Sequence, residues 1–151
     1  MQGTEIDPAP RRYPSFVALL RRADDGRAGL RRRDLGDLEA WLLTEAADER
    51  DLLALFQAFV WRLVAAGLPL RRASLHIGTL HPLLFGYAWN WNSDDGFCDE
   101  VKVAEEALAT DAYRRNPLYR VIEEGARYRA PVGDEAAWGR ARSWRSWRPR
   151  A

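Results

Sequence analysis

The chain has 151 residues, of which 47% are hydrophobic and 30% are charged, so one domain with a packed core is feasible. Its 23 basic and 22 acidic side chains leave a formal net charge of +1, which provides no overall attraction to nucleic acid or membranes. A single cysteine, Cys98, excludes an internal disulfide and fits a reducing compartment. No apolar run approaches the roughly 18 residues of a membrane span, and no signal-peptide pattern is visible at the N-terminus. We therefore expect a cytoplasmic protein.

Residues 1–33 are rich in Arg, Pro and Gly, and we interpret them as a flexible leader. Within this leader, Phe16, Val17, Leu19 and Leu20 could form a short helical turn. A folded domain is expected to begin at residue 34.

Two helices are predicted next. Leucines at positions 35, 38 and 42 recur at helical spacing and predict a helix to about residue 46. Asp48 is a plausible N-cap for a longer helix, because its carboxylate can accept first-turn amide hydrogens. Gly67 can take the left-handed position that ends this helix, and Pro69 prevents its continuation. The apolar stripe of the longer helix comprises Leu52, Leu55, Phe56, Phe59, Val60 and Leu63.

The hydrophobic period then changes to two, which predicts strands. Residues 71–79 read as a first strand and residues 85–91 as a second. The Asn-Ser-Asp-Asp-Gly run at 92–96 has the composition of a turn, so residues 97–103 are expected to return as a third strand of a hairpin.

The C-terminal third is less regular. Residues 104–109 look helical, and Asn116 followed by Pro117 is a helix start. That helix is expected to bury Leu118, Val121 and Ile122 and to end at Gly125, and residues 127–132 are expected to form a short strand. Residues 133–151 are an irregular tail rich in Arg and Trp.

Three segments resemble a known family. The run 67–82, Gly-Leu-Pro-Leu-Arg-Arg-Ala-Ser-Leu-His-Ile-Gly-Thr-Leu-His-Pro, is similar to a segment upstream of the catalytic domain in bacterial class III adenylate/guanylate cyclases. The Tyr-Ala-Trp-Asn-Trp strand at 87–91 and the Asn-Pro-Leu-Tyr helix start at 116–119 resemble later parts of the same region. The resemblance covers roughly residues 35–129.

The resemblance implies an α+β fold over residues 34–132. It would be a GAF/PAS-like antiparallel sheet of three to four strands with flanking helices, which serves as an input module for a cyclase output domain. The family continues with further strands and a cyclase domain whose paired metal-binding aspartates are absent here. We therefore expect a truncated or frame-shifted relative, or a stand-alone remnant, without cyclase activity. Its incomplete sheet would keep an unpaired edge and an incompletely covered apolar face.

One face of the 85–91 strand carries Phe85, Tyr87, Trp89 and Trp91. In a fold of this kind such a face either lines a small-ligand pocket or packs beneath the long helix, and both interpretations stay open. The candidate ligand-binding residues are therefore Tyr87, Trp89 and Trp91, together with His81 at the Leu-His-Pro corner. The sequence names no ligand and no cofactor.

Catalytic chemistry finds little support. Cys98 is followed by Asp99 and Glu100, whose negative charge disfavours the reactive thiolate, so we expect a buried or half-buried strand cysteine. His76 and His81 are the only histidines, and a closed zinc site usually wants four ligands. We predict no catalytic residue and no metal site.

These observations favour a non-catalytic sensory or regulatory domain that acts in signal transduction by binding a ligand or partner. The expected partner is a cyclase-type output domain or another protein subunit, and a homodimer is possible. One alternative is a dimerisation or protein-interaction module that uses the sheet edge. Another is nucleic-acid binding through the Arg/Trp tail, because guanidinium and indole groups bind phosphates and stack on bases. No membrane partner is expected.

Overall fold

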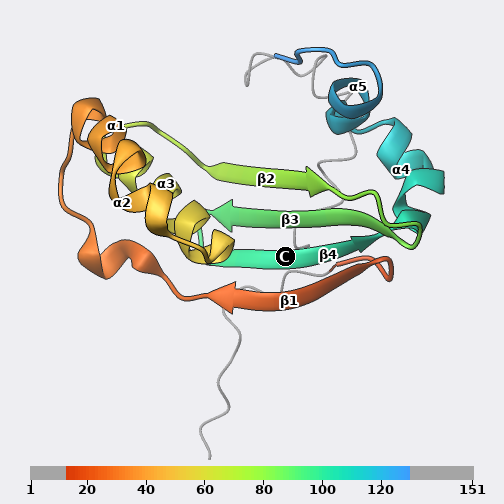
Figure 1. Cartoon of the computed structure of the whole chain (residues 1–151), viewed down its shortest axis with the longest axis horizontal. Helices are drawn as coiled ribbons and strands as arrows, with labels where there is room; N and C mark the ends of the chain where they lie inside the picture. The colour runs from red at the N-terminus through yellow and green to blue at the C-terminus, as the bar shows by residue number, and fades with distance from the viewer. Residues whose placement is uncertain (1–12, 130–151) are drawn as a thin grey trace, which may run out of the picture.

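The computed structural model describes residues 13–129, which form an α+β fold around one four-stranded antiparallel sheet (Figure 1). The strands lie in the order β1-β4-β3-β2, so β1 and β2 are the two edges among the described residues. This architecture confirms the predicted α+β class and the antiparallel sheet. The strand bounds are β1 Val17–Ala23, β2 Arg72–Gly78, β3 Leu84–Asn92 and β4 Cys98–Ala104.

The helices gather at the two ends of the sheet (Figure 1). The first group is α1 (Leu35–Leu43), α2 (Glu45–Asp48) and α3 (Leu52–Ala65), which lie together at one end. The second group, at the opposite end, contains α4 (Asp111–Arg114) and α5 (Pro117–Glu123). Two short 3₁₀ helices, η1 (Gly26–Gly29) and η2 (Glu105–Ala109), connect the sheet to these groups.

The three predicted strands are confirmed as β2, β3 and β4, and β3 and β4 form the predicted hairpin; β2 pairs with the other side of β3, which completes a meander. Trp91 of β3 pairs with Ala73 of β2 on one side and with Cys98 of β4 on the other. The predicted turn between β3 and β4 is also confirmed, and Gly96 supplies its positive φ of 75°. The Oδ1 atom of Asn92 accepts the amide of Asp94 at 3.1 Å, which closes the start of the turn.

The prediction of a helical turn at residues 16–20 is wrong, because this part of the expected leader contains strand β1. The strand runs antiparallel to β4, from Val17 opposite Val103 to Ala23 opposite Cys98. Without β1, the outer edge of β4 would present unpaired amides and carbonyls, and pairing satisfies them. A bulge between Leu19 and Arg21 shifts the register.

The long helix α3 is confirmed, but its N-cap is Asp51 instead of the predicted Asp48. The Asp51 carboxylate accepts the amide of Leu53 at 3.0 Å. Asp48 is the last residue of the separate short helix α2, so it cannot cap the start of α3. Gly67 follows α3 with a φ of 92°, the left-handed conformation that the sequence predicted.

The main core lies between α3 and one face of the sheet. Val60 of α3 is fully buried, and Trp91 of β3 is 1% exposed. The rings of Trp61 and Trp91 meet edge to face with centroids 5.2 Å apart. The buried members of this cluster are Leu53, Phe56, Val60, Trp61, Trp89, Trp91 and Cys98. A second cluster of Leu38, Trp41 and Ala46 joins α1 and α2 to the other side of α3.

Helix α5 starts as predicted but buries none of its residues. The side chain of Asn116 accepts the amide of Leu118 at 3.0 Å, and Gly125 follows the helix with a φ of 63°. Val121 and Ile122, which were predicted to be buried, are each 44% exposed. The prediction fails because α5 lies off the edge of the sheet, next to α4, and not against a face of the sheet (Figure 1). The strand predicted at 127–132 is absent from residues 127–129, and the rest lies outside the described residues.

Candidate functional site

The structure brings together three of the four predicted ligand-binding residues. Tyr87, Trp89 and Trp91 occupy one face of β3, and the rings of Tyr87 and Trp89 have centroids 6.4 Å apart. Trp89 and Trp91 are buried beneath α3, whereas Tyr87 is half-buried at the margin of this core. His81 is exposed in the connection between β2 and β3, where its Nδ1 accepts the amide of Leu83 at 3.1 Å.

The core beneath α3 contains buried polar hydrogens without acceptors. The indole nitrogens of Trp61, Trp89 and Trp91 are buried and have no hydrogen-bond partner. Most buried donors in proteins are paired, and an unpaired one costs about 1–3 kcal/mol. Trp61 also lines a pocket.

This pocket, with a volume of about 290 Å³, lies between residues 26–33 and the face of α3 that carries Ala54 and Ala58. Two hydrogen bonds attach the chain around residues 26–33 to α3, one just before this segment and one at its last residue. The side chain of Gln57 donates to the carbonyl of Asp24, and the amide of Arg33 donates to the carbonyl of Ala65 at 3.2 Å. The complete lining is Gly26, Leu30, Arg31, Arg33, Ala54, Gln57, Ala58, Trp61, Arg62 and Ala65.

Gly26, at the start of η1, packs directly against the Trp61 side chain in the pocket wall. A Cβ atom at position 26 would lie 2.7 Å from both Cδ1 and Nε1 of Trp61. Only a residue without a side chain lets the backbone approach the indole this closely. The carboxylate of Asp25 caps η1 by accepting the amide of Arg27 at 3.0 Å, which fixes the path of the chain here.

The described lining of the pocket is basic. Three arginines line it, at positions 31, 33 and 62, and no acidic side chain is among its described lining residues. None of the three forms an ion pair with another residue of the described chain. Such a lining is suited to binding an anion, because guanidinium groups match the geometry of carboxylates and phosphates.

Arg62 is the most constrained of these arginines. Its guanidinium stacks on the Trp41 ring, 4.0 Å from the centroid, and its Nη1 donates to the carbonyl of Ala58 at 3.3 Å. The Nε atom is buried without a partner. Desolvation lowers the pKa of Arg62, the charge of Arg33 lowers it further, and Glu45 opposes both effects more weakly.

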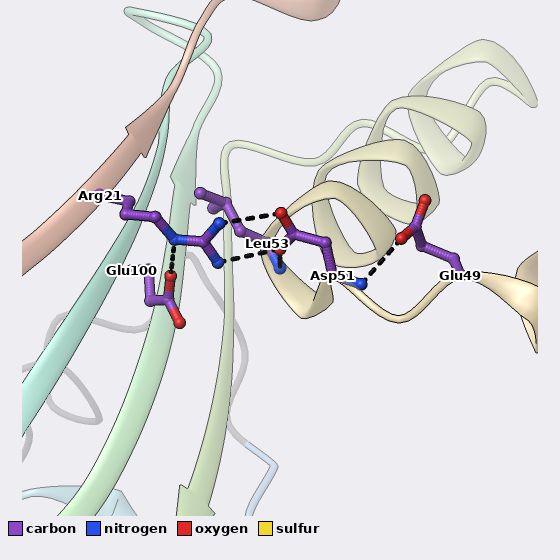
Figure 2. A network of polar contacts seen from close by, with 5 residues as sticks. All are labelled: Arg21, Glu49, Asp51, Leu53 and Glu100. Atoms are coloured by element: carbon purple, nitrogen blue, oxygen red, sulfur yellow. Dashed lines mark hydrogen bonds and ion pairs between the residues drawn. The ribbon is translucent and has the colours of Figure 1, made fainter.

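A polar network fastens the N-terminus of α3 to the sheet (Figure 2). The guanidinium of Arg21 donates two hydrogen bonds to the carboxylate of Asp51, at 2.8 and 2.9 Å, and its Nε donates to Glu100 at 2.5 Å. The bonds to Asp51 and Glu100 raise the pKa of Arg21, and the bond from Arg21 lowers the pKa of Asp51. Arg21 and Asp51 are both well exposed, so solvent screens this network.

The opposite face of the sheet contains a buried ion pair. Asp99 is fully buried, and Arg22 donates to its carboxylate through Nε at 2.7 Å and through Nη2 at 3.2 Å. The hydroxyl of Tyr13 donates to the same carboxylate at 2.6 Å. The Asp99 carboxylate therefore has a structural role, since it binds Arg22 of β1. The neighbouring Cys98 is also buried, as predicted.

Within residues 13–129, no three or more His, Cys, Asp or Glu side chains are grouped closely enough to hold a metal ion. His76 lies on β2 opposite Ala88, and although much of its surface is exposed, desolvation lowers the pKa of its imidazole. The same part of the chain contains no helix with the length and apolar character needed to cross a bilayer.

Comparison with protein-family models, with curated proteins and with solved structures gave no match for this chain.

Sequence reasoning missed the arginine-lined pocket. Its two walls come from the expected leader and from α3, which are separated by some twenty residues of α1 and α2. The available signal was the Arg-Arg-Arg run at 31–33 directly before a capped helix, combined with alanines at positions 54, 58 and 65 of α3. The predicted nucleic-acid tail, 133–151, lies outside the described residues.

Proposed function

We propose that this chain is a non-catalytic sensory domain of GAF/PAS-like type, related to the input region of bacterial adenylate/guanylate cyclases. It responds to a bound ligand or partner by changing how α3 packs on the sheet, and an output domain or another subunit reads this change. The resemblance over residues 35–129 motivates the family, and an antiparallel sheet flanked by helices is the architecture that this resemblance implies.

The observation that carries the proposal is that α3 is shared between the core and the pocket. Trp61 meets Trp91 of the sheet edge to face and also lines the pocket. A molecule in the pocket therefore contacts a helix that packs on the sheet through its other side. Occupancy favours whichever packing of α3 binds the molecule better, which is the thermodynamic requirement for a sensor.

The surroundings of the potentially reactive side chains support a non-catalytic role. Cys98 is buried in the core, where an apolar environment disfavours the thiolate. The Asp99 carboxylate is occupied by Arg22 and Tyr13. His81 binds the backbone of its own loop. None of these groups faces the arginine-lined pocket as a lining residue.

Two measurements test the proposed function. Purified chain is first assayed for cyclic nucleotide formation from ATP and GTP with magnesium or manganese, and robust turnover would contradict a non-catalytic domain. The melting temperature is then measured against panels of cationic, neutral and anionic metabolites, because a ligand that binds only the folded state raises it by mass action. The proposal expects one class to stabilise the chain, or a complex with a class III cyclase catalytic domain in size-exclusion chromatography. If no metabolite class stabilises the chain and no complex forms, the proposal is refuted.

A second candidate function is a protein-interaction module, favoured by apolar side chains at one end of β2. Leu80 is fully exposed, Leu83 is 75% exposed and Ile77 is 42% exposed. Exposed apolar groups of this size, next to a sheet edge, are typical of association surfaces. Light scattering after size-exclusion chromatography tests this function. A dimer that Leu80→Ser and Leu83→Ser convert to monomer would support it, and a monomer at all concentrations would contradict self-association.

A further inference from the structure

We propose that the pocket between residues 26–33 and α3 binds a small organic oxyanion. The guanidinium groups of Arg31, Arg33 and Arg62 hold the phosphate or carboxylate, and the apolar wall holds a compact apolar or aromatic body. This inference rests on the proposed function, because it names the ligand class to which the sensory domain responds.

The basic lining of the pocket favours an anionic ligand. Three arginines line one pocket whose described lining contains no carboxylate. Like charges close together are costly in a protein unless a partner offsets them. An oxyanion in the pocket supplies the negative charge that its described lining lacks.

The helix wall determines the shape of the ligand. Ala54, Ala58, Trp61 and Ala65 recur at intervals of four, three and four residues, so they share one face of α3. Small side chains on this face keep the pocket open, and the indole provides a flat apolar surface. A volume of about 290 Å³ lies just below the usual range for small-molecule sites, roughly 300–1,000 Å³. The pocket therefore fits a single ring or short chain bearing one oxyanion.

The pocket also explains how occupancy reaches the fold. Residues 26–33 connect β1 to α1, and the amide of Arg33 binds the carbonyl at the C-terminal end of α3. Gly26 lies directly against the Trp61 indole. An anion held between Arg33 of the segment and Arg62 of α3 would bridge the two walls, stabilising the connection between β1 and the helix.

The test is calorimetric titration of the full chain with four probes: phenyl phosphate, benzoate, inorganic phosphate and phenol. Phenyl phosphate or benzoate is expected to bind, and whichever binds more tightly identifies the oxyanion. Phenol lacks the charge and inorganic phosphate lacks the apolar body, so both should bind more weakly. Raising salt from about 50 to about 300 mM should weaken binding, because solvent-accessible ion pairs are screened.

Two variants separate this pocket from general attraction to a basic surface. Arg33→Gln removes an exposed guanidinium and should weaken binding about tenfold or more, the effect of losing a hydrogen bond to a charged group. Ala54→Phe fills the groove at an exposed position and should abolish binding without changing net charge. Arg71→Gln is the matched control, since Arg71 is 81% exposed and pairs with Asp94 away from the pocket; it should bind like the wild type.

Failure of both oxyanions to bind at millimolar concentration would overturn the inference, as would equal binding by wild type, Arg33→Gln and Ala54→Phe. A neutral or cationic metabolite that stabilises the wild type and both variants equally would also overturn the oxyanion inference. The proposed sensory function would stand in that case. Circular dichroism of each variant confirms that any loss of binding is not a loss of folding.

Discussion

Replacing Gly26 with alanine adds one methyl group at the contact between η1 and α3. The new Cβ would lie 2.7 Å from Cδ1 and Nε1 of Trp61, far inside the ordinary contact distance of 3.4–4 Å. Trp61 is 7% exposed and packs edge to face against Trp91, so its indole has little freedom to move away. Either the 26–33 segment or the indole must shift.

The expected cost is that of overpacking a core, about 1–3 kcal/mol. Glycine-to-alanine replacement also reduces the entropy of the unfolded chain, which stabilises by about 0.4–1 kcal/mol where no clash occurs. The net destabilisation is therefore expected to be about 1–2 kcal/mol. For a domain of this size it corresponds to a fall in melting temperature of roughly 4 °C for each kcal/mol.

Urea denaturation followed by circular dichroism measures this change, with Gly78→Ala as the matched control. A Cβ at position 78 would meet its nearest neighbour, the carbonyl oxygen of Phe85, at 3.9 Å, and Gly78 does not have a positive φ. Gly78→Ala should be neutral or slightly stabilising. Equal stability of the two variants would refute the reasoning, because it would mean that the segment does not rest on the Trp61 indole.

Two further predictions concern the ion pairs. Asp99→Asn should lower the free energy of unfolding by roughly 3 kcal/mol, at the low end for a broken buried pair because Arg22 keeps 21% exposure. Urea denaturation of Asp99→Asn, Arg22→Met and the double variant measures the coupling, and a loss below about 1 kcal/mol would contradict this assignment. Arg21 lowers the pKa of Asp51 below 3.8, so this carboxylate stabilises the fold above that pH, and the contribution is lost as pH falls through the lowered pKa. Asp51→Asn keeps an N-cap acceptor but no longer titrates, so it should lose less stability than the wild type on acidification below about pH 4. Parallel curves of unfolding free energy against pH for the two proteins would contradict this prediction.

The β3–β4 hairpin and α3 could be predicted because their signals are local. The alternation at 85–91 specifies a strand, and the Asn-Ser-Asp-Asp-Gly turn returns the chain into its neighbour. The apolar stripe of α3 and the left-handed Gly67 specify a helix and its end. Such features depend on residues within about one turn of each other, so one sequence suffices to predict them.

Strand β1 could not be predicted from its own residues. Val17–Ala23 reads as a short apolar run followed by two arginines, and most of its side chains are exposed, so no alternation marks a buried face. Its pairing partner, β4, is about eighty residues away in the chain. Strand propensity depends on such neighbours more than on the strand itself.

The pocket was missed for the same reason. Arg31 and Arg33 belong to a segment that composition alone assigns to a leader, and Arg62 looks like a solvent-facing residue of α3. Their convergence depends on tertiary contacts, notably the bond from Arg33 to Ala65. Conversely, the aromatic pattern of β3 was visible, but whether Trp89 and Trp91 line a pocket or a core depends on where α3 lies.

The most direct measurement is hydrogen–deuterium exchange of the full chain with and without saturating phenyl phosphate or benzoate, whichever binds. We predict slower exchange in residues 26–33 and in α3, Leu52–Ala65, with α5 unchanged at the far end of the sheet. Binding without any change in α3 would contradict the claim that this helix relays ligand occupancy to the rest of the domain.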